Sequence, residues 1–278
     1  MARLRLSQIR SRYEAGQPIP MVTAYDAPLA QAAEEADIPL LLVGDSLGMV
    51  VLGYESTLQV TMEDMIRHTQ ATVRATETPF IVADMPFLSY QVSVSEAIAN
   101  AGRLVQIGGA QAVKLEGGTA VCDRVSAIVQ TGIPVMGHLG LTPQSVHQLG
   151  GYGMQARTEV EAEKLLEAAQ QLEAAGAFAI VLESVPEEVG ERVTKTLHIP
   201  TIGIGAGRKT SGQVLVTHDM LGFNPRPAKF VRRFADLRTP LVEALRAYNE
   251  AVTAGTFPAE AEVRHASFPN FNDAGTSQ

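Results

Sequence analysis

The sequence predicts an α/β fold, a single (β/α)8 TIM barrel, and three observations lead to it. Short apolar runs recur along the chain, helix-like stretches separate most of them, and polar residues gather where the runs end. Runs that are apolar on both faces are typical of strands in a buried parallel sheet. Their alternation with helices favours a barrel, and a doubly wound open sheet is the alternative.

Eight runs are expected to form strands, and several begin with a proline, which suits a strand entrance where no ladder donor is required. They are "PMVTAYD" (20–26), "PLLLVGD" (39–45), "PFIVADMP" (79–86), "AVKLEGG" (112–118), "PVMGHLG" (134–140), "FAIVLESV" (178–185), "PTIGIGAG" (200–207) and "GQVLVTHD" (212–219). The interval between the last two runs is too short for a full crossover helix. This interval is the weak point of the barrel prediction.

The stretches between the runs carry apolar residues at helical spacing, and they often close with a glycine. Helices are expected within 28–36, 62–76, 93–107, 121–131, 158–176 and 186–197. The Arg-rich start, "MARLRLSQIRSRYEAG", is expected to hold a first helix, with an organellar transit peptide as the alternative. A last helix at about 237–254 would complete one catalytic domain over 1–254. The tail, 255–278, lacks periodicity, and we expect it to be flexible or packed on a neighbour.

Composition excludes several classes of protein. A net charge of -8 over 278 residues gives no reason to expect nucleic acid or an anionic membrane surface as a partner. No apolar run approaches the roughly 18 residues that a membrane-spanning helix needs. The one cysteine, Cys122, excludes an internal disulfide and fits a reducing compartment. We therefore expect a cytoplasmic protein.

Carboxylates stand at the ends of successive strands. Asp45 and Ser46 follow the second strand, Asp84 ends the third and Glu116 the fourth. In a barrel these strand ends meet at one face, where the active site lies. Three carboxylates could converge there on one cation, and oxygen ligands suit Mg2+ better than Zn2+. Each alone could instead cap a helix or face solvent, but together they would repel one another without a cation.

Three further residues at strand ends are candidates for binding and proton transfer. Lys114 shares a strand side with Glu116, so it could hold a substrate carboxylate, act as a Schiff-base nucleophile or simply pair with Glu116. His138 stands among the glycines of "MGHLG", where a ligand can approach closely. Glu183 follows the apolar run "FAIVL", and desolvation would raise its pKa and suit it to proton abstraction. Capping of the next helix is the alternative for Glu183.

Other candidates carry less chemistry. The stretch "GIGAG" (203–207) lacks the helix and acidic residue of a dinucleotide site, so binding of a phosphate or close approach of a ligand to the backbone stays open. His68 and His147 fall on helix-like or loop segments. His218 is expected in the last strand with a structural role.

Long blocks of the chain carry a family resemblance. They are "MVTAYD", "LLVGDSLGMVVLGYESTLQVTMEDMIRHT", "VADMPFLSY", "AVKLEGG", "IPVMGHLGLTPQSVHQLGGYGMQAR", "IVLESVP", "IPTIGIGAG" and "GQVLVTHDMLG". In this order they resemble the ketopantoate hydroxymethyltransferase family over most of the chain. The resemblance implies a barrel of the phosphoenolpyruvate/pyruvate type, a Mg2+ site and a homodecamer. It also implies hydroxymethyl transfer from 5,10-methylenetetrahydrofolate to 3-methyl-2-oxobutanoate, which gives 2-dehydropantoate in the first step of pantothenate biosynthesis.

The resemblance also implies roles for single residues. Asp45, Asp84 and Glu116 would surround the metal. Ser46, Lys114 and His138 would contact the keto acid beside the two aspartates, and Glu183 would be the base. The family usually shows an aspartate just before "GQVLV", where this chain has Ser211, so folate contacts near that position are in doubt.

The implied chemistry explains the strand-end carboxylates. Mg2+ would chelate the keto acid, acidify its C3–H and stabilise the enolate, while Glu183 takes the proton. The enolate carbon would then attack the methylene released from the folate as an iminium, and water would complete the hydroxymethyl group. A Mg-dependent oxo-acid lyase or mutase of the isocitrate lyase type is one alternative, because it would share the metal carboxylates. A metal-dependent binding protein is the other, and it would need no base.

Overall fold

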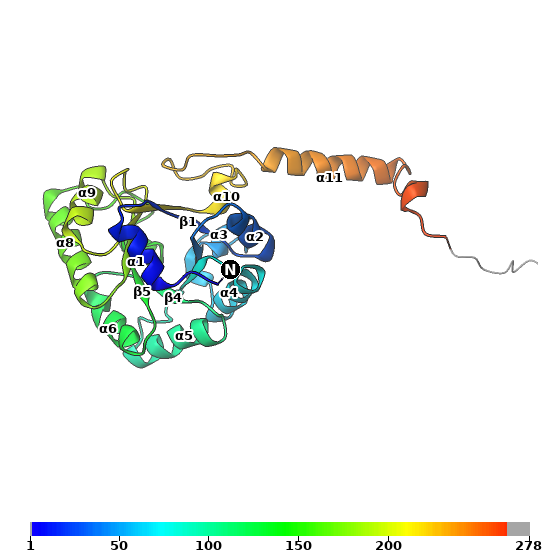
Figure 1. Ribbon diagram of the computed structural model, residues 1–278. Helices are drawn as coiled ribbons and strands as arrows, with labels where there is room; N and C mark the ends of the chain where they lie inside the picture. The colour runs from blue at the N-terminus through cyan, green and yellow to red at the C-terminus, as the bar shows by residue number, and fades with distance from the viewer. Residues whose placement is uncertain (1, 266–278) are drawn as a thin grey trace, which may run out of the picture.

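The eight apolar runs form parallel strands that close into a barrel in sequence order (Figure 1). The computed structural model describes residues 2–265. The strands are β1 (Ile19–Thr23), β2 (Leu40–Val43), β3 (Phe80–Asp84), β4 (Ala112–Glu116), β5 (Val135–Gly140), β6 (Ala179–Glu183), β7 (Thr201–Ile204) and β8 (Gly212–Leu215). Because β1 pairs with both β2 and β8, the sheet has no edge. The barrel prediction is confirmed, and the open sheet is excluded.

Helices surround the barrel and follow its first six strands. The long ones are α2 (Ala27–Glu35), α4 (Met62–Ala75), α5 (Val94–Gln106), α6 (Cys122–Gln130), α8 (Glu159–Ala174) and α9 (Glu187–Thr196). Short pieces within the loops are α3 (Leu47–Val50), α7 (Val146–Leu149), α10 (Thr217–Met220), η1 (Thr57–Gln59), η2 (Thr119–Val121) and η3 (Pro143–Ser145). Capping boxes begin α4 at Thr61 and α8 at Thr158, which explains why both helices start where they do. Every helix expected between the strands is confirmed.

The last two strands are joined without a helix, as their short interval predicted. Residues 205–211 return beside the barrel as a loop, and an extended chain of this length spans the four-residue strand β7 because it rises about 3.3 Å per residue. β8 is shorter than expected, because Thr217 N donates to Thr23 Oγ1 at 2.9 Å and turns the chain out of the sheet. His218 therefore lies on α10, and its placement in the last strand was wrong.

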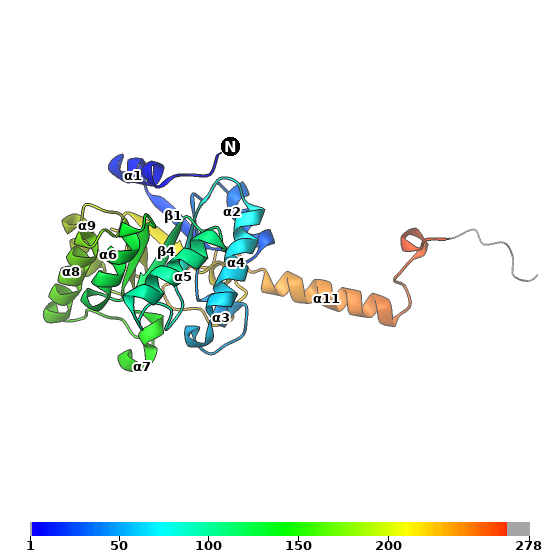
Figure 2. The same cartoon turned by 90° about the horizontal axis from the view of Figure 1, so that it is seen from below.

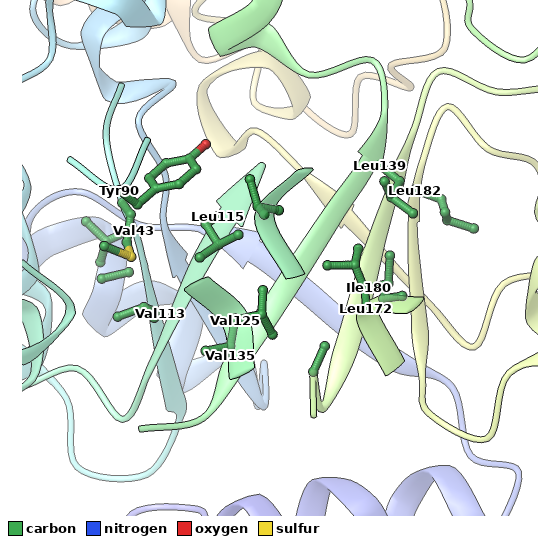
Figure 3. Packing of buried hydrophobic residues seen from close by; sticks show 14 of the residues in the cluster. Val43, Tyr90, Val113, Leu115, Val125, Val135, Leu139, Leu172, Ile180 and Leu182 are labelled. Atoms are coloured by element: carbon green, nitrogen blue, oxygen red, sulfur yellow. The ribbon is translucent and has the colours of Figure 1, made fainter. Parts of the chain in front are cut away.

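Side chains alternate between two separate apolar layers along each strand. On β3, Phe80 and Val82 belong to a cluster inside the barrel, whereas Ile81 and Ala83 join the layer between strands and helices. Figure 3 shows part of that outer layer, with Val125 of α6 among its residues. The inner cluster is smaller and also takes in Ile9 from outside the sheet.

Helix α1 (Leu6–Glu14) covers one end of the barrel. Its Ile9 is buried against the inner cluster, with Leu4, Leu6 and Tyr13 packed beside it. Figure 2 shows α1 at the end opposite α3 and α7, which lie at the carboxyl ends of the strands. The first segment is thus an ordinary helix of the domain that closes the amino-terminal end of the barrel.

Helix α11 (Arg238–Thr253) extends away from the barrel (Figures 1 and 2). None of its residues is buried, although the helix is amphipathic. The described part of the tail is exposed and contains η4 (Glu260–Glu262), while 266–278 lie outside the described residues, so the expected tail boundary and flexibility stay predictions. Over 2–265, no helix has both the length and the apolar character needed to cross a membrane.

Candidate active site

Alternation along the strands places the charged candidates at one end of the barrel interior. Asp84, two residues after Val82, shares the inward side of β3 with it. The same spacing brings Lys114 and Glu116 of β4, His138 of β5 and Glu183 of β6 inward above the inner cluster. All five therefore meet at the carboxyl ends of the strands, where the barrel architecture places active sites.

Asp45 and Ser46 reach the same place from the loop after β2. Asp45 is buried, and its backbone N–H donates to Asp84 Oδ2 at 3.0 Å, so the two aspartates are tied together. Ser46 Oγ lies 2.8 Å from the hydroxyl of Tyr25, a fully buried side chain that follows β1. Asp45 and Ser46 both line the cavity above the cluster.

Lys114 is the buried cation at the centre of the cluster. Its Nζ lies 3.1 Å from Asp84 Oδ1 and 3.1 Å from His138 Nδ1. Burial acts to lower the Lys114 pKa, but Asp84, Glu116 and Asp45 outweigh it and raise the pKa above its ordinary value. Lys114 is therefore charged at neutral pH, which favours binding of an anion over action as a Schiff-base nucleophile.

His138 bridges two carboxylates. Its Nδ1 lies 3.4 Å from Glu116 Oε1, and its Nε2 lies 3.1 Å from Glu183 Oε2. Burial and Lys114 act to lower the His138 pKa, but the bonds with Glu116 and Glu183 raise it to about 9. Both carboxylates line the cavity, and the Glu183 side chain is the more open one, with 16% exposed against 3% for Glu116. The ring of His138 thus holds Glu183 at the mouth of the cluster.

The glycines around His138 have packing roles. Gly137 faces Leu172 of α8, and a Cβ there would lie 3.0 Å from the Leu172 Cδ1 atom. Gly140 has a φ of +89°, and a Cβ would collide with the carbonyl oxygen of Glu183. These two glycines therefore allow helix α8 and strand β6 to lie close to β5. The sequence had suggested instead that they allow a ligand to approach.

Gln144 and Tyr90 are buried polar residues of the site that sequence reasoning missed. Gln144 Nε2 donates to Asp45 Oδ2 at 2.8 Å, and its backbone N–H donates to Glu116 Oε2 at 2.9 Å. Tyr90 OH donates to Gln144 Oε1 at 2.7 Å. Both lie in loops, where no periodicity marks a buried face. Their only sign in the sequence is that each follows a strand end.

The cluster carries excess negative charge. Four carboxylates face two cations, so the formal charge is -2 when all are ionised: Asp45, Asp84, Glu116 and Glu183 against Lys114 and His138. Burial, Asp84 and Glu116 raise the Asp45 pKa well above its ordinary value. Asp84 Oδ1 is buried against the Lys114 ammonium, and Asp84 Oδ2 accepts from the Asp45 backbone N–H. Both oxygens of Glu116 already have partners, and its pKa is lowered because His138 and Lys114 outweigh its burial.

A cavity of about 850 Å3 opens above the cluster. Its outer wall is mainly apolar and aromatic and is formed by Met49, Val50, Tyr54, Tyr152, Phe223, Phe230 and Val231. The ring of Phe230 lies against Gly205, where a Cβ would come within 2.6 Å of its Cδ1 atom. The close approach that "GIGAG" suggested is therefore made by this ring, which seats the loop after α10 at the cavity.

Of the remaining candidates, His218 alone lines the cavity. His218 packs between Tyr25 and Phe223, and its Nδ1 is buried without a partner. His68 Nδ1 bonds to the Tyr25 carbonyl at 2.6 Å, a structural contact. Ser211 bonds with Thr201 at the amino-terminal end of the barrel, away from the carboxyl ends of the strands.

Comparison with known proteins decides the family. A family model described as "Ketopantoate hydroxymethyltransferase" matches residues 3–260. The chain belongs to the ketopantoate hydroxymethyltransferase family. It is 55% identical to the 3-methyl-2-oxobutanoate hydroxymethyltransferase of Carboxydothermus hydrogenoformans, over 94% of this chain and 95% of that protein. It is 54% identical to that of Ignicoccus hospitalis, over 94% and 98%.

Solved structures support the fold of this family member. A phosphonopyruvate hydrolase solved with oxalate and Mg2+ matches with a TM-score of 0.63 and 13% identity, over 94% of this chain and 92% of that one. A 2,3-dimethylmalate lyase described as a member of the PEP mutase/isocitrate lyase superfamily matches with 0.61 and 16%, over 95% and 91%. Identities this low establish the fold alone. The predicted (β/α)8 barrel and the predicted family are both confirmed.

Proposed function

We propose that this protein transfers a hydroxymethyl group from 5,10-methylenetetrahydrofolate to 3-methyl-2-oxobutanoate by enolising the keto acid. One observation carries the mechanism: a buried cation, Lys114, and a carboxylate open to the cavity, Glu183, stand on either side of His138. The first suits the substrate carboxylate and the second suits proton removal. Family membership supports the transfer reaction, and it disfavours both alternatives, the lyase or mutase of the isocitrate lyase type and the metal-dependent binding protein.

The chain's own residues would bind and deprotonate the keto acid. Lys114 and Ser46 would hold its oxygens, because Lys114 stays charged and the Ser46 hydroxyl is fixed by Tyr25. Glu183 would take the C3 proton, a contribution of about 100- to 10,000-fold for a placed base. His138, with its pKa raised to about 9, would orient Glu183 and stabilise negative charge nearby. The resulting carbanion would form the new C–C bond to the one-carbon unit, while both C–N bonds that hold this carbon in the folate break, water supplies the hydroxyl oxygen and tetrahydrofolate leaves.

The carboxylates fit a magnesium ion held by Asp45 and Asp84. The two aspartates are buried side by side with Lys114 as their paired cation, and a second cation beside Asp45 would offset the burial and the repulsion by Asp84 and Glu116 that raise its pKa. Among residues 2–265 no three His, Cys, Asp or Glu side chains are grouped as a closed metal site, and Mg2+ commonly uses one or two carboxylates plus water. Glu116, already bonded, would therefore contribute through water. When bound, the ion would polarise the keto group and acidify the C3–H.

The outer cavity fits the folate. The cavity is larger than the five-carbon keto acid requires, and its aromatic wall at Tyr54, Tyr152 and Phe223 suits a planar fused ring. We propose that the keto acid lies on the polar cluster and that the pteridine ring lies above it. In this arrangement the methylene carbon faces the deprotonated C3.

Proton NMR of 3-methyl-2-oxobutanoate in D2O tests the enolisation. With enzyme and Mg2+ and without folate, the C3 proton signal should disappear, and either EDTA or Glu183→Gln should stop the loss. Glu188→Gln, a change in the first turn of α9, is the control and should exchange like the wild type. Full exchange by Glu183→Gln would remove the residue from the role of base. If the wild type does not exchange, repeating the measurement with tetrahydrofolate decides whether folate must bind first or the mechanism is wrong.

Assembly and location complete the proposal. We propose a homodecamer in the cytoplasm, with the unpacked helix α11 as an element that docks on another copy of the chain. Its apolar residues Leu241, Leu245, Tyr248 and Val252 are 46–60% exposed and recur at helical spacing on one face. The single half-buried Cys122 agrees with a reducing compartment.

A further inference from the structure

The side-chain amide of Gln144 has all its hydrogen-bonding capacity in use. Its two N–H groups donate to Asp45 Oδ2 at 2.8 Å and to the Met85 carbonyl at 2.9 Å. Its oxygen accepts from Tyr90 OH at 2.7 Å and from Gln91 Nε2 at 3.2 Å. The reverse orientation would set three oxygens against one another, so the amide can face only one way.

Tyr90 holds that orientation from the opposite side. It is 1% exposed, and its hydroxyl accepts from the Glu116 backbone N–H at 3.1 Å while donating to Gln144. Gln144 N also donates to the Glu116 carboxylate at 2.9 Å. The pair therefore connects the loops after β2, β3 and β5 with the end of β4 through buried bonds.

We propose that Gln144, anchored by Tyr90, is a positioning residue that directs the Asp45 carboxylate toward the metal. Occupation of Oδ2 by an amide donor leaves Oδ1 of Asp45 as the oxygen available to the cavity, beside the Asp84 carboxylate that pairs with Lys114. The inference rests on the proposed function, in which these two aspartates hold the ion. Partners of this kind typically contribute 10- to 100-fold to metal affinity.

A purely structural role would give a different result, and the chain offers a matched control. Gln111 also bridges two segments by its amide: its Nε2 donates to Leu4 O at 2.6 Å and its Oε1 accepts from Ile81 N at 3.1 Å. It lies at the start of β4, at the other end of the barrel. Gln111→Met therefore removes two part-buried amide hydrogen bonds far from the site, whereas Gln144→Met removes four within it.

The test measures the binding of Mn2+, an ion that oxygen ligands also bind. The EPR signal of the free ion reports how much Mn2+ stays unbound at each point of the titration. The protein is titrated with saturating 3-methyl-2-oxobutanoate and without folate. Gln144→Met should weaken Mn2+ binding by about 10- to 100-fold. Tyr90→Phe should weaken Mn2+ binding less, because Gln144 loses one hydrogen bond but keeps its own bond to Asp45. Gln111→Met should bind Mn2+ with an affinity within about twofold of the wild type, even if its melting temperature falls as much as that of Gln144→Met.

The outcomes separate this inference from the function on which it rests. If Gln144→Met and Tyr90→Phe both bind Mn2+ as Gln111→Met does, the positioning role is wrong. Asp45→Asn tests the function itself: normal binding by Asp45→Asn, or no Mn2+ uptake by the wild type, would remove Asp45 from the metal site. Loss of binding in Asp45→Asn but not in Gln144→Met would overturn only the positioning role.

Discussion

Each buried charge of the site is compensated by a specific neighbour. Lys114 is held by Asp84, and His138 lies between Glu116 and Glu183. Removal of one member leaves its partner buried and unpaired, which is far more damaging than loss of an exposed pair. Substitutions in the cluster should therefore change ligand binding and stability together, and each needs a control for folding.

Lys114→Ala should weaken binding of 3-methyl-2-oxobutanoate about tenfold or more, because a charge-assisted bond to its carboxylate is lost. Calorimetric titration of the keto acid in the presence of Mg2+ measures the effect. Lys164→Ala, an exposed lysine on α8, should bind as the wild type does. Unchanged affinity in Lys114→Ala would leave Lys114 only its structural pairing with Asp84.

The charged candidates could be predicted from sequence because each belongs to a strand end, and strand ends of a barrel converge. Asp84, Glu116 and Glu183 needed nothing more than the position of their strands. Gln144 and Tyr90 could not be predicted, because their importance comes from contacts with residues far away in the chain. The pairing partners of a loop residue are set only when the barrel closes.

At the scale of the elements, the contact between the loop after β7 and the loop after α10 has the most direct effect on the shape of the cavity. Gly205, with a φ of +63°, admits the ring of Phe230, and Phe230 lines the outer cavity. The eight strands and the helices between them were predictable from apolar runs and helical spacing. The close contact between these two loops was not, since neither loop has a periodic pattern.

Gly205→Ala should raise the KM for the folate several-fold and leave keto-acid affinity unchanged, because the new Cβ displaces Phe230 from the outer wall. Steady-state kinetics with each substrate varied in turn give the measurement. Gly132→Ala is the matched control, since its φ is +90° but no atom lies within 4 Å of the added Cβ. It should cost about 1 kcal/mol of stability from backbone strain alone. Equal folate KM values for the two variants would argue against a folate wall at Phe230.

At the scale of the whole molecule, helix α11 differs from the other long helices because none of its residues is buried within the described part of the chain. Phe257 packs against Tyr248, but most of the apolar face of α11 stays exposed within residues 2–265. The sequence predicted the helix to within a residue at each end, because its periodicity is strong. It did not indicate that the helix would stand apart from the barrel, since the same pattern suits packing on the same chain or on another.

Leu245→Lys should lower the assembly state, because a lysine would replace an apolar residue at the centre of the exposed face. Light scattering after size-exclusion chromatography measures the molar mass. Glu250→Lys places the same side chain on the opposite face of α11 and should keep the wild-type mass. If Leu245→Lys runs at the wild-type mass, α11 does not hold the assembly together.

Closure of the barrel by α1 also has a kinetic consequence. Ile9 and its neighbours fill the amino-terminal end, so the polar cluster can be reached only through the cavity at the other end. If the keto acid lies at the bottom of this cavity and the folate above it, as proposed, substrate binding would be ordered: the keto acid would bind before the folate, and its product would leave after the tetrahydrofolate.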